Sequence, residues 1–466
     1  MLDKIRRHAL SHPNSIAYKI GHQSITYSEL FNKASIYADL LKKQGSSPVI
    51  IYGKKSLDTV ISILACIIAG RTYIPLDMSS PISRIEIIAS LASSTLVLTN
   101  EAIEITGCCC IPPEKLSVFE KLDGICTESN IVYIIFTSGT TGVPKGVPIS
   151  KENLNNFIDW ISSLRPLCEY SYINVMNQAE FCFDLSVADL FYSLCNGHRL
   201  VSYEPDKENV AEFIKKNEIN VAVITPTFAR LCLLDDEFCE DYCPFLKCIY
   251  FCGETLDKKT VERLFTRFSN IKIINAYGPT EATSAVSATE ITRDMLFTEN
   301  TLPIGNTDTF ATEITIDDGE IILQGKSVFG GYLKQDSPNC YKSCGCNFYR
   351  TGDLGYIKDG KLYYNGRKDL QIKYKGYRIE LCEIENNLLK INRVTECVVI
   401  PKYSVDGTVK AIWAFVTVEG DLDEVHIKKK LSKIIPSYMI PKKIKIVNKL
   451  PVNHNQKIDR KALENL

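Results

Sequence analysis

A loop rich in glycine and hydroxyl side chains has the residue types that bind phosphate. It follows the apolar run Val132–Phe136, which suits a buried strand, and it reads TSGTTGVPKG over residues 137–146. Backbone N–H groups, hydroxyls and one lysine charge can together surround phosphate oxygens. The candidate donors are Thr137, Ser138, Gly139, Thr140, Thr141, Gly142 and Lys145. A flexible glycine-rich turn is the alternative interpretation of the loop taken alone.

This loop is not the P-loop of nucleoside triphosphatases. That motif places a lysine directly after its second glycine and a serine or threonine after the lysine. Here Lys145 comes three residues after Gly142 and is followed by Gly146. The spacing therefore indicates a phosphate loop of a different kind.

Three further groups could act on a nucleotide. In the run Asn275–Glu281 (NAYGPTE), an aromatic ring beside a Gly-Pro turn can face a purine, although a surface turn with a capping Thr-Glu pair has the same sequence. Asp353 can accept from two ribose hydroxyls and Arg367 can add a donor, but a loop aspartate is also a common turn former. Lys457 taken alone is an ordinary solvated tail lysine.

The elements that must position these residues alternate between short apolar runs and helical stretches. Examples are Pro48–Tyr52 before a helix from Ser56 to Ala69, and Cys248–Cys252 before a helix from Lys258 to Phe268. That alternation predicts layered α/β subdomains with mostly parallel strands. From Asn306 onward, short β runs broken by Gly and Asp predict a small β-rich subdomain. We expect a large N-terminal body over residues 1–368 and a small α+β C-terminal domain over residues 369–466.

Composition excludes several protein classes. The chain has 466 residues, 45% hydrophobic and 23% charged, and a net charge of −1, which argues against disorder and against a nucleic-acid partner. Its 18 cysteines are too sparse for a disulfide scaffold, and their spacing does not form the paired ligands of a zinc site. Neither a signal sequence nor a run of about 20 apolar residues is visible, so we expect a cytoplasmic protein without membrane insertion.

Several motifs in order resemble the adenylate-forming enzymes, the superfamily of acyl-CoA synthetases, luciferases and amino-acid adenylation domains. After the loop at 137–146 come NAYGPTEAT at 275–283, YRTGDLG at 349–355 and NQKIDRK at 455–461. Within the superfamily, the runs 181–194 (FCFDLSVADLFYSL) and 251–254 (FCGE) are most similar to D-alanine:D-alanyl carrier protein ligases.

The resemblance implies a role for each nucleotide-site residue. Tyr277 stacks on adenine beside Asn275 and Ala276, Asp353 and Arg367 bind ribose, Thr280 contacts the α-phosphate and Glu281 binds Mg²⁺. Lys457 is the catalytic lysine that bridges the substrate carboxylate and the α-phosphate. The sequence departs from the family at Gln456, where a glycine is usual. Asp369 resembles the hinge about which the C-terminal domain rotates.

Asp184 indicates an amino-acid substrate, because a carboxylate in a pocket requires a cation such as an amine. A helix N-cap is the competing interpretation of Asp184, which precedes the helical stretch 185–194. By resemblance, the other pocket residues are Leu185, Ala188, Thr227, Tyr250, Cys252, Gly253, Ala276, Ser284 and Ala285. The pocket suits D-alanine, or a larger or more polar amino acid that extends past Ala188 toward the Tyr250 hydroxyl.

The expected reaction is ATP-dependent adenylation of a small amino acid, followed by thioester transfer to the phosphopantetheine arm of a separate carrier protein. Because the motifs occupy the chain throughout, we expect the acceptor to come from another protein. From Asp421 to Leu466 there are 11 Lys and Arg against 5 Asp and Glu, so an acidic carrier is predicted to dock there, although a solvated basic face is the simpler interpretation. A CoA-thioester synthetase and a non-catalytic nucleotide-binding homologue remain alternatives.

Overall fold

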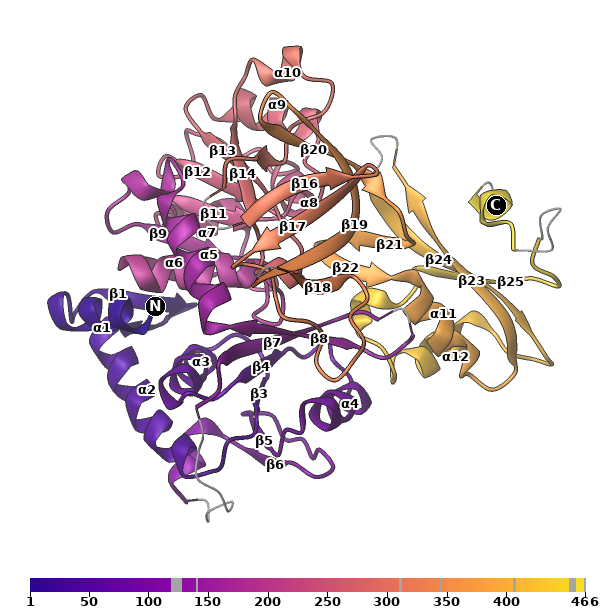
Figure 1. The fold of residues 1–466 in the computed structure, drawn as a ribbon, viewed down its shortest axis with the longest axis horizontal. Helices are drawn as coiled ribbons and strands as arrows, with labels where there is room; N and C mark the ends of the chain where they lie inside the picture. Colours follow the sequence, from indigo (N-terminus) through magenta and orange to yellow (C-terminus); the bar gives the residue numbers. More distant parts are fainter. Residues whose placement is uncertain are drawn as a thin grey trace. The chain divides into compact units, whose positions relative to one another are not determined.

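The chain forms two compact units. The structure is a computed structural model that describes residues 1–118, 128–139, 141–309, 312–343, 345–404, 408–451 and 458–464. Unit 1 comprises Met1–Asp77, Ala92–Ile135 and Val147–Lys368; unit 2 comprises Met78–Leu91, Phe136–Gly146 and Asp369–Leu466. One division falls between Lys368 and Asp369, and two earlier segments cluster with the C-terminal residues. The large mixed α/β body and the smaller C-terminal part confirm the predicted fold class (Figure 1).

The main sheet of unit 1 has eight strands in the order β14-β13-β12-β11-β9-β10-β1-β2. The six strands from β13 to β1 run parallel to their neighbours, and the two edge strands are antiparallel. Their bounds are β1 Ile16–Ile20, β2 Gln23–Thr26, β9 Asn174–Asn177, β10 Arg199–Ser202, β11 Val221–Ile224, β12 Cys248–Phe251, β13 Lys272–Tyr277 and β14 Ser287–Ile291. This sheet is the parallel α/β layer that the alternation predicts.

The strand β12 shows why its sequence is apolar throughout. Cys248 and Tyr250 point into one hydrophobic core, whereas Ile249 and Phe251 point into a second core on the opposite face of the sheet. A strand buried on both faces cannot alternate between apolar and polar residues. The first core also takes in α3 (Leu57–Ala69) and α6 (Leu185–Asn196), so Tyr250 faces the same side as α6.

A second, six-stranded sheet has the order β6-β5-β3-β4-β7-β8. Its strands are β3 Val49–Tyr52, β4 Tyr73–Leu76, β5 Leu96–Leu98, β6 Cys109–Ile111, β7 Ile131–Thr137 and β8 Lys145–Ser150. The helix α3 begins where the Ser56 hydroxyl accepts from the Thr59 N–H and ends at Gly70 in the left-handed conformation. The serine cap and the left-handed glycine explain why α3 begins and ends within one residue of the predicted Ser56–Ala69.

The β-rich subdomain predicted from Asn306 is an antiparallel sheet in the order β15-β20-β19-β17-β16, with β18 beside β19. Its strands are β15 Gly305–Asn306, β16 Thr312–Asp317, β17 Glu320–Gly325, β18 Cys340–Ser343, β19 Cys346–Lys358 and β20 Lys361–Arg367. The pairing of β19 with β20 sets Asp353 opposite Arg367.

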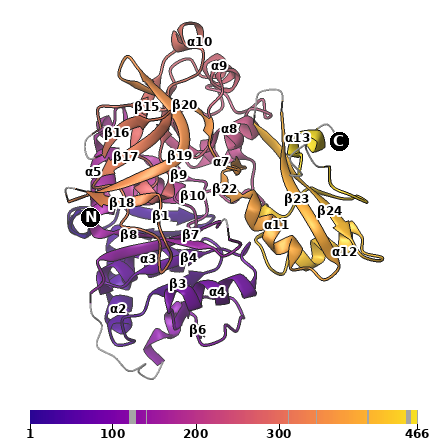
Figure 2. The same cartoon turned by 45° about the vertical axis from the view of Figure 1, so that its right-hand side comes forward.

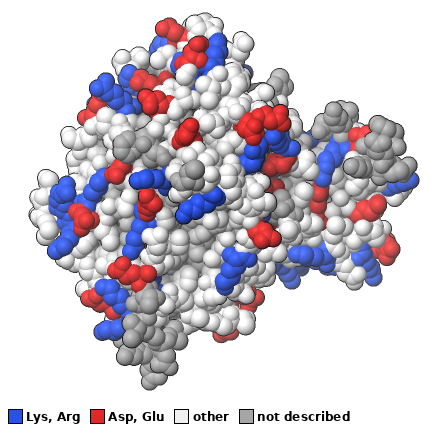
Figure 3. Space-filling view, viewed as in Figure 1, with Lys and Arg blue, Asp and Glu red and all other residues white. Residues whose placement is uncertain are grey.

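The other helices of unit 1 are α1 Leu2–Ser11, α2 Tyr27–Lys42, α5 Lys151–Ser163, α7 Val210–Lys216, α8 Pro226–Cys232, α9 Lys258–Arg267 and α10 Met295–Thr298. Acidic and basic side chains are interspersed on the face of unit 1 in Figure 3, in keeping with the near-neutral composition. Among the described residues, none of the helices has the length and apolar character needed to cross a membrane.

Unit 2 contains the hairpin β21 Gln371–Tyr374 and β22 Tyr377–Glu380, and a three-stranded sheet. The sheet strands are β23 Val394–Tyr403, β24 Val409–Val418 and β25 Lys443–Ile446, and the helices are α4 Ile82–Ala92, α11 Leu381–Leu389, α12 Glu424–Leu431 and α13 Arg460–Glu464. The helix α11 lies along β23, and together with α12 it covers one face of the sheet with a separate hydrophobic core (Figure 2).

Candidate active site

The motif from Asn275 to Ala285 folds back on itself at the end of β13. The Val286 N–H donates to the Tyr277 carbonyl at 2.8 Å, and a Cβ on Gly278 would lie 2.5 Å from the Ala285 Cα. Only glycine fits this approach. Thr283 and Ser284 then take left-handed conformations, with φ of 59° and 72°. These costly backbone angles in non-glycine residues concentrate at functional sites.

Tyr277, Asp353 and Arg367 form one buried cluster. The Tyr277 hydroxyl donates to Asp353 Oδ2 at 2.7 Å, and Arg367 Nη1 lies 2.5 Å from Asp353 Oδ1. Asp353 is 2% exposed, so the turn-former interpretation is wrong. Burial, followed by the Asp353 charge, raises the pKa of Tyr277 well above its usual value. Three residues from β13, β19 and β20 that the sequence assigned to adenosine therefore lie together.

Asp184 does not cap the helix that follows it. Its backbone is already helical, with φ −65° and ψ −22°, and its side chain makes no capping hydrogen bond. Instead its Oδ2 accepts from the Thr280 hydroxyl at 2.6 Å. The N-cap interpretation is therefore wrong, and the half-buried carboxylate lies beside the residue assigned to the α-phosphate.

Glu281 is a buried acid that accepts a hydrogen bond from a tyrosine. It is 1% exposed, and its Oε1 accepts from the Tyr332 hydroxyl at 2.6 Å. Thr280 is 6% exposed, so a surface turn is excluded for this pair. Among the described residues, no cluster of three or more His, Cys, Asp or Glu side chains could hold a metal ion. A single carboxylate fits Mg²⁺ only where phosphate oxygens and water complete the coordination, which is how this ion is commonly bound.

Six of the predicted amino-acid pocket residues lie on the α6 side of the main sheet. Leu185, Ala188, Tyr250, Cys252, Ala276 and Ala285 all belong to the first hydrophobic core. Cys252 Sγ contacts the Ser284 carbonyl at 3.8 Å, while the Thr227 N–H donates to Glu254 Oε2 at 2.9 Å beyond Gly253. The buried Tyr250 hydroxyl has no hydrogen-bond partner among the described residues. An unsatisfied buried hydroxyl is costly, so Tyr250 has the capacity for one further hydrogen bond.

The loop 137–146, predicted to bind phosphate, belongs to unit 2, where two of its candidate donors, Gly139 and Ser138, are already hydrogen-bonded. The Gly139 N–H donates to Glu383 Oε2 at 2.8 Å, and Glu383 Oε1 accepts from Arg84 Nη1 at 2.7 Å. The Ser138 hydroxyl donates to the Arg378 carbonyl and accepts from the Glu380 N–H. A carboxylate and a phosphate oxygen compete for the same N–H donors. A nucleotide phosphate must therefore displace Glu383 before it can use Gly139.

The rest of the loop is placed as follows. Thr137 ends β7 and Thr141 is exposed, while Gly142 is buried against Asn386 and Lys145 is half-buried at the start of β8. A Cβ on Gly139 would lie 2.0 Å from the Val143 carbonyl oxygen, which explains the glycine. Thr140, Gln456 and the catalytic candidate Lys457 lie outside the described residues.

Sequence reasoning missed three residues of these clusters: Tyr332, Arg84 and Glu383. Each bonds a partner far away in the chain: the residue numbers of Tyr332 and Glu281 differ by 51, and those of Glu383 and Gly139 differ by 244. The only signal for Glu383 is that it lies in an apolar helical stretch, α11, where it is fully buried.

Comparison with known proteins now decides the family. The family model described as AMP-binding enzyme matches residues 5–333, and the model of the AMP-binding enzyme C-terminal domain matches residues 383–457. The chain belongs to the AMP-binding enzyme family. The superfamily predicted from the motifs is confirmed.

This AMP-binding enzyme is similar to curated proteins along its whole length. It is 37% identical to the D-alanine--D-alanyl carrier protein ligase of Bacillus licheniformis, covering 100% of this chain and 99% of the relative. It is 36% identical to the ligase of the same name from Lactococcus lactis, covering 99% and 98%. The predicted resemblance to this group of ligases is confirmed.

Solved structures agree with the fold. The Vibrio cholerae adenylation domain AlmE, in complex with glycyl-adenosine-5'-phosphate, matches with a TM-score of 0.84 and 26% identity, covering 100% of this chain and 97% of that one. The o-succinylbenzoate CoA synthetase of Bacillus subtilis matches with a TM-score of 0.86 at 20% identity, covering 99% and 98%, which shows the fold alone.

Proposed function

We propose that this protein is an AMP-forming ligase that activates a small amino acid with ATP and transfers it to a carrier protein. The observation that carries the proposal is the Asp184 carboxylate beside Thr280, 2.6 Å apart, on the side of the sheet that holds the pocket residues. Full-length similarity to D-alanine--D-alanyl carrier protein ligases supports the same reaction. AlmE, whose structure holds a glycyl adenylate, supports an amino-acid substrate.

The reaction has two steps. A carboxylate oxygen of the amino acid attacks the α-phosphorus of ATP, the bond to the β-phosphate oxygen breaks, and pyrophosphate leaves. The thiol of the phosphopantetheine arm then loses its proton and attacks the acyl carbon, so that a thioester forms and AMP leaves. The protein mainly positions groups and neutralises charge.

Each residue cluster has a role in this scheme. Asp184 binds the ammonium group, Thr280 the α-phosphate, and Asp353 with Arg367 the ribose. Glu281 would hold Mg²⁺, which would neutralise phosphate charge. Lys457 bridges the attacking carboxylate and the α-phosphate. Residues 1–368 and 369–466 act as functional domains that move about Asp369.

Carrier loading tests the proposal directly. The protein is incubated with ATP, Mg²⁺, D-alanine and a phosphopantetheinylated carrier, and the carrier mass is measured by mass spectrometry. We expect a mass increase of one aminoacyl group, no increase on the carrier that lacks phosphopantetheine, and loss of loading with Asp184→Asn. Formation of an acyl-CoA with no carrier loading would instead favour the CoA synthetase alternative.

We also propose that the carrier is acidic and docks on the basic C-terminal segment. Lys429 and Lys430 of α12 are exposed. The double change Lys429→Glu and Lys430→Glu should lower the kcat/KM for the carrier about tenfold at low salt and flatten its salt dependence. Pyrophosphate exchange should stay unchanged. Equal loading and equal salt dependence in the variant would contradict this docking site.

A further inference from the structure

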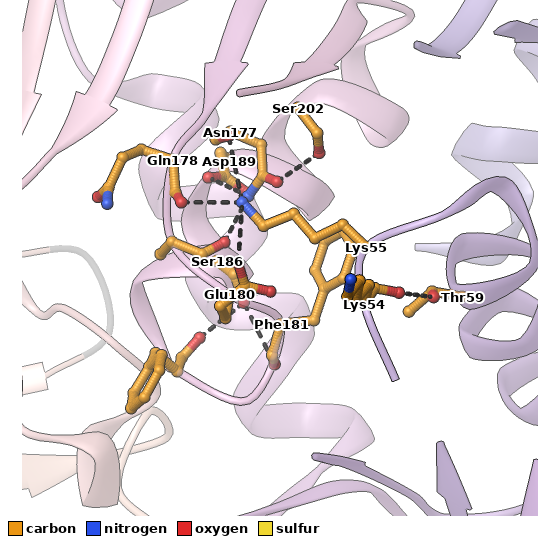
Figure 4. A network of polar contacts seen from close by, with 12 residues as sticks. Lys54, Lys55, Thr59, Asn177, Gln178, Glu180, Phe181, Ser186, Asp189 and Ser202 are labelled. Atoms are coloured by element: carbon orange, nitrogen blue, oxygen red, sulfur yellow. Dashed lines mark hydrogen bonds and ion pairs between the residues drawn. The ribbon is translucent and has the colours of Figure 1, made fainter. Parts of the chain in front are cut away.

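A buried lysine outside the proposed reaction centre contacts the segment that leads to Asp184. Lys55 lies between β3 and α3, and its side chain is only 4% exposed. Figure 4 shows its ammonium group among residues of β9, α6 and the segment that joins them. All of these residues belong to unit 1, so Lys55 bridges the six-stranded and eight-stranded sheets.

The Lys55 ammonium holds backbone carbonyls of the joining segment. Its Nζ donates to the Gln178 carbonyl at 2.8 Å and lies 3.5 Å from the Asn177 carbonyl. It also forms an ion pair with Glu180 Oε1 at 3.8 Å. The segment continues through Phe183 to Asp184, where α6 begins. Lys55 therefore fixes one end of a short loop whose other end carries the proposed amine-binding carboxylate.

A second acid, Asp189, ties α6 to the same network. Asp189 is fully buried, and its Oδ2 accepts from Asn177 Nδ2 at 2.9 Å. Asn177 in turn accepts from the Ser202 hydroxyl at 2.6 Å, and Ser202 contacts the Tyr18 hydroxyl at 2.9 Å. Burial raises the pKa of Asp189 well above its usual value and also raises the pKa of Glu180; the Asn177 hydrogen bond to Asp189 and the Lys55 charge beside both acids oppose this shift. The network thus connects four elements to one ammonium group.

Such a network is a poor source of stability, because desolvation of buried charges offsets their attraction. Its clearer effect is geometric, because Lys55 bonds the Gln178 carbonyl and Asn177 bonds the Ala179 carbonyl, which fixes the start of the joining segment even though Asp189 Oδ1 has no partner among the described residues. We propose that Lys55 is a positioning residue for the amino-acid site, which holds the segment 177–184 so that the Asp184 carboxylate faces the substrate amine. This inference rests on the proposed function.

Activity with paired substrates tests the proposal. Lys55→Met keeps the side-chain length without the charge, and the double variant Lys55→Met/Asp189→Asn also removes the buried acid charge left behind. The KM and kcat are measured by pyrophosphate exchange with the preferred amino acid and with its des-amino acid, which does not need Asp184. Thermal unfolding is recorded for each variant.

For both variants we expect the KM of the amino acid to rise at least tenfold, while the KM of ATP and the kcat/KM of the des-amino acid change less than threefold. The double variant should recover thermal stability yet keep the raised KM. Lys55→Arg, which keeps the charge, should raise the KM of the amino acid less than Lys55→Met does. Equal losses with both substrates, or recovery of the KM together with stability, would overturn the positioning role.

A readout independent of activity separates this inference from the proposed function. Hydrogen exchange of the amides in residues 178–184 should accelerate at least tenfold in the double variant and remain unchanged in the control Lys54→Met. Unchanged exchange would refute the anchoring role even in an active enzyme. Failure of the proposed function would appear differently, as a wild-type protein that activates the des-amino acid in preference to every amino acid.

Discussion

Asp184 and Thr280, 96 residues apart in the chain, are joined by a hydrogen bond of 2.6 Å from the threonine hydroxyl to the carboxylate. The carboxylate is the proposed ligand of the substrate amine, and the hydroxyl is the proposed contact of the α-phosphate. The bond therefore links the amino-acid half of the site to the phosphate half.

Thr280→Val should impair amino-acid binding as well as the chemical step. A hydrogen bond to a charged group contributes about 1.5–3 kcal/mol, so we expect the kcat/KM for the amino acid to fall about 10- to 100-fold. Thr280→Ser, which keeps the hydroxyl, should stay within a few-fold of wild type. Pyrophosphate exchange under saturating ATP measures the effect. A change confined to the KM of ATP would contradict the link.

Asp353→Asn should weaken binding of the ribose. Asp353 accepts from Tyr277 and pairs with Arg367, so its charge loss weakens two charge-assisted contacts as well as the proposed bonds to the ribose. We expect the KM of ATP to rise at least tenfold and the KM of the amino acid to change little. With 2'-deoxy-ATP the penalty should be smaller. An equal penalty with both nucleotides would place Asp353 away from the sugar.

Glu383→Gln should destabilise unit 2. The change leaves the Arg84 side chain, which is 6% exposed, without the counter-charge that lies 2.7 Å away. Breaking a buried ion pair costs about 3–5 kcal/mol, and the retained amide oxygen should reduce this to about 3 kcal/mol. Hydrogen exchange of the Gly139 amide measures the effect. The control Glu396→Gln, on an exposed residue of β23, should change stability by less than about 0.5 kcal/mol.

His198 should make folding sensitive to acid. Burial lowers the pKa of His198 to about 4, and its ring Nδ1 accepts from the Ile173 N–H. In the unfolded state the His198 ring therefore takes up a proton near pH 6.5, whereas in the folded state it does so only near pH 4. His198 therefore does not lower the free energy of unfolding above pH 6.5, and it lowers that free energy by about 3 kcal/mol as the pH drops to 4. Denaturant unfolding at pH 7 and pH 4.5 should show a smaller difference for His198→Asn than for the exposed control His22→Asn. An unchanged difference would contradict this assignment.

The sequence predicted best the features that are encoded locally. The strand β12 and the helix α3 were placed within one or two residues because apolar runs and a capping serine set their limits. The ordered motifs similarly predicted that Tyr277 and Asp353 serve one nucleotide site.

Long-range contacts were not predictable, because residue type does not specify a distant partner. The residues around Asp184 fit a helix N-cap as well as they fit a hydrogen-bond partner of Thr280, so the local sequence cannot choose between the two interpretations. Residues 78–91 and 136–146 group with the C-terminal residues through contacts between distant positions, such as the Arg84–Glu383 ion pair, whose partners are separated by 299 positions. The buried Lys55 also gave no local signal, since lysine is rarely buried.

The central claim is that the chain adenylates an amino acid through Asp184, and pyrophosphate exchange across the amino acids tests it most directly. We expect one small amino acid, with D-alanine as the first candidate, to support exchange that Lys457→Ala abolishes and Asp184→Asn reduces at least 100-fold. Exchange supported by aryl or fatty acids but by no amino acid would contradict the claim.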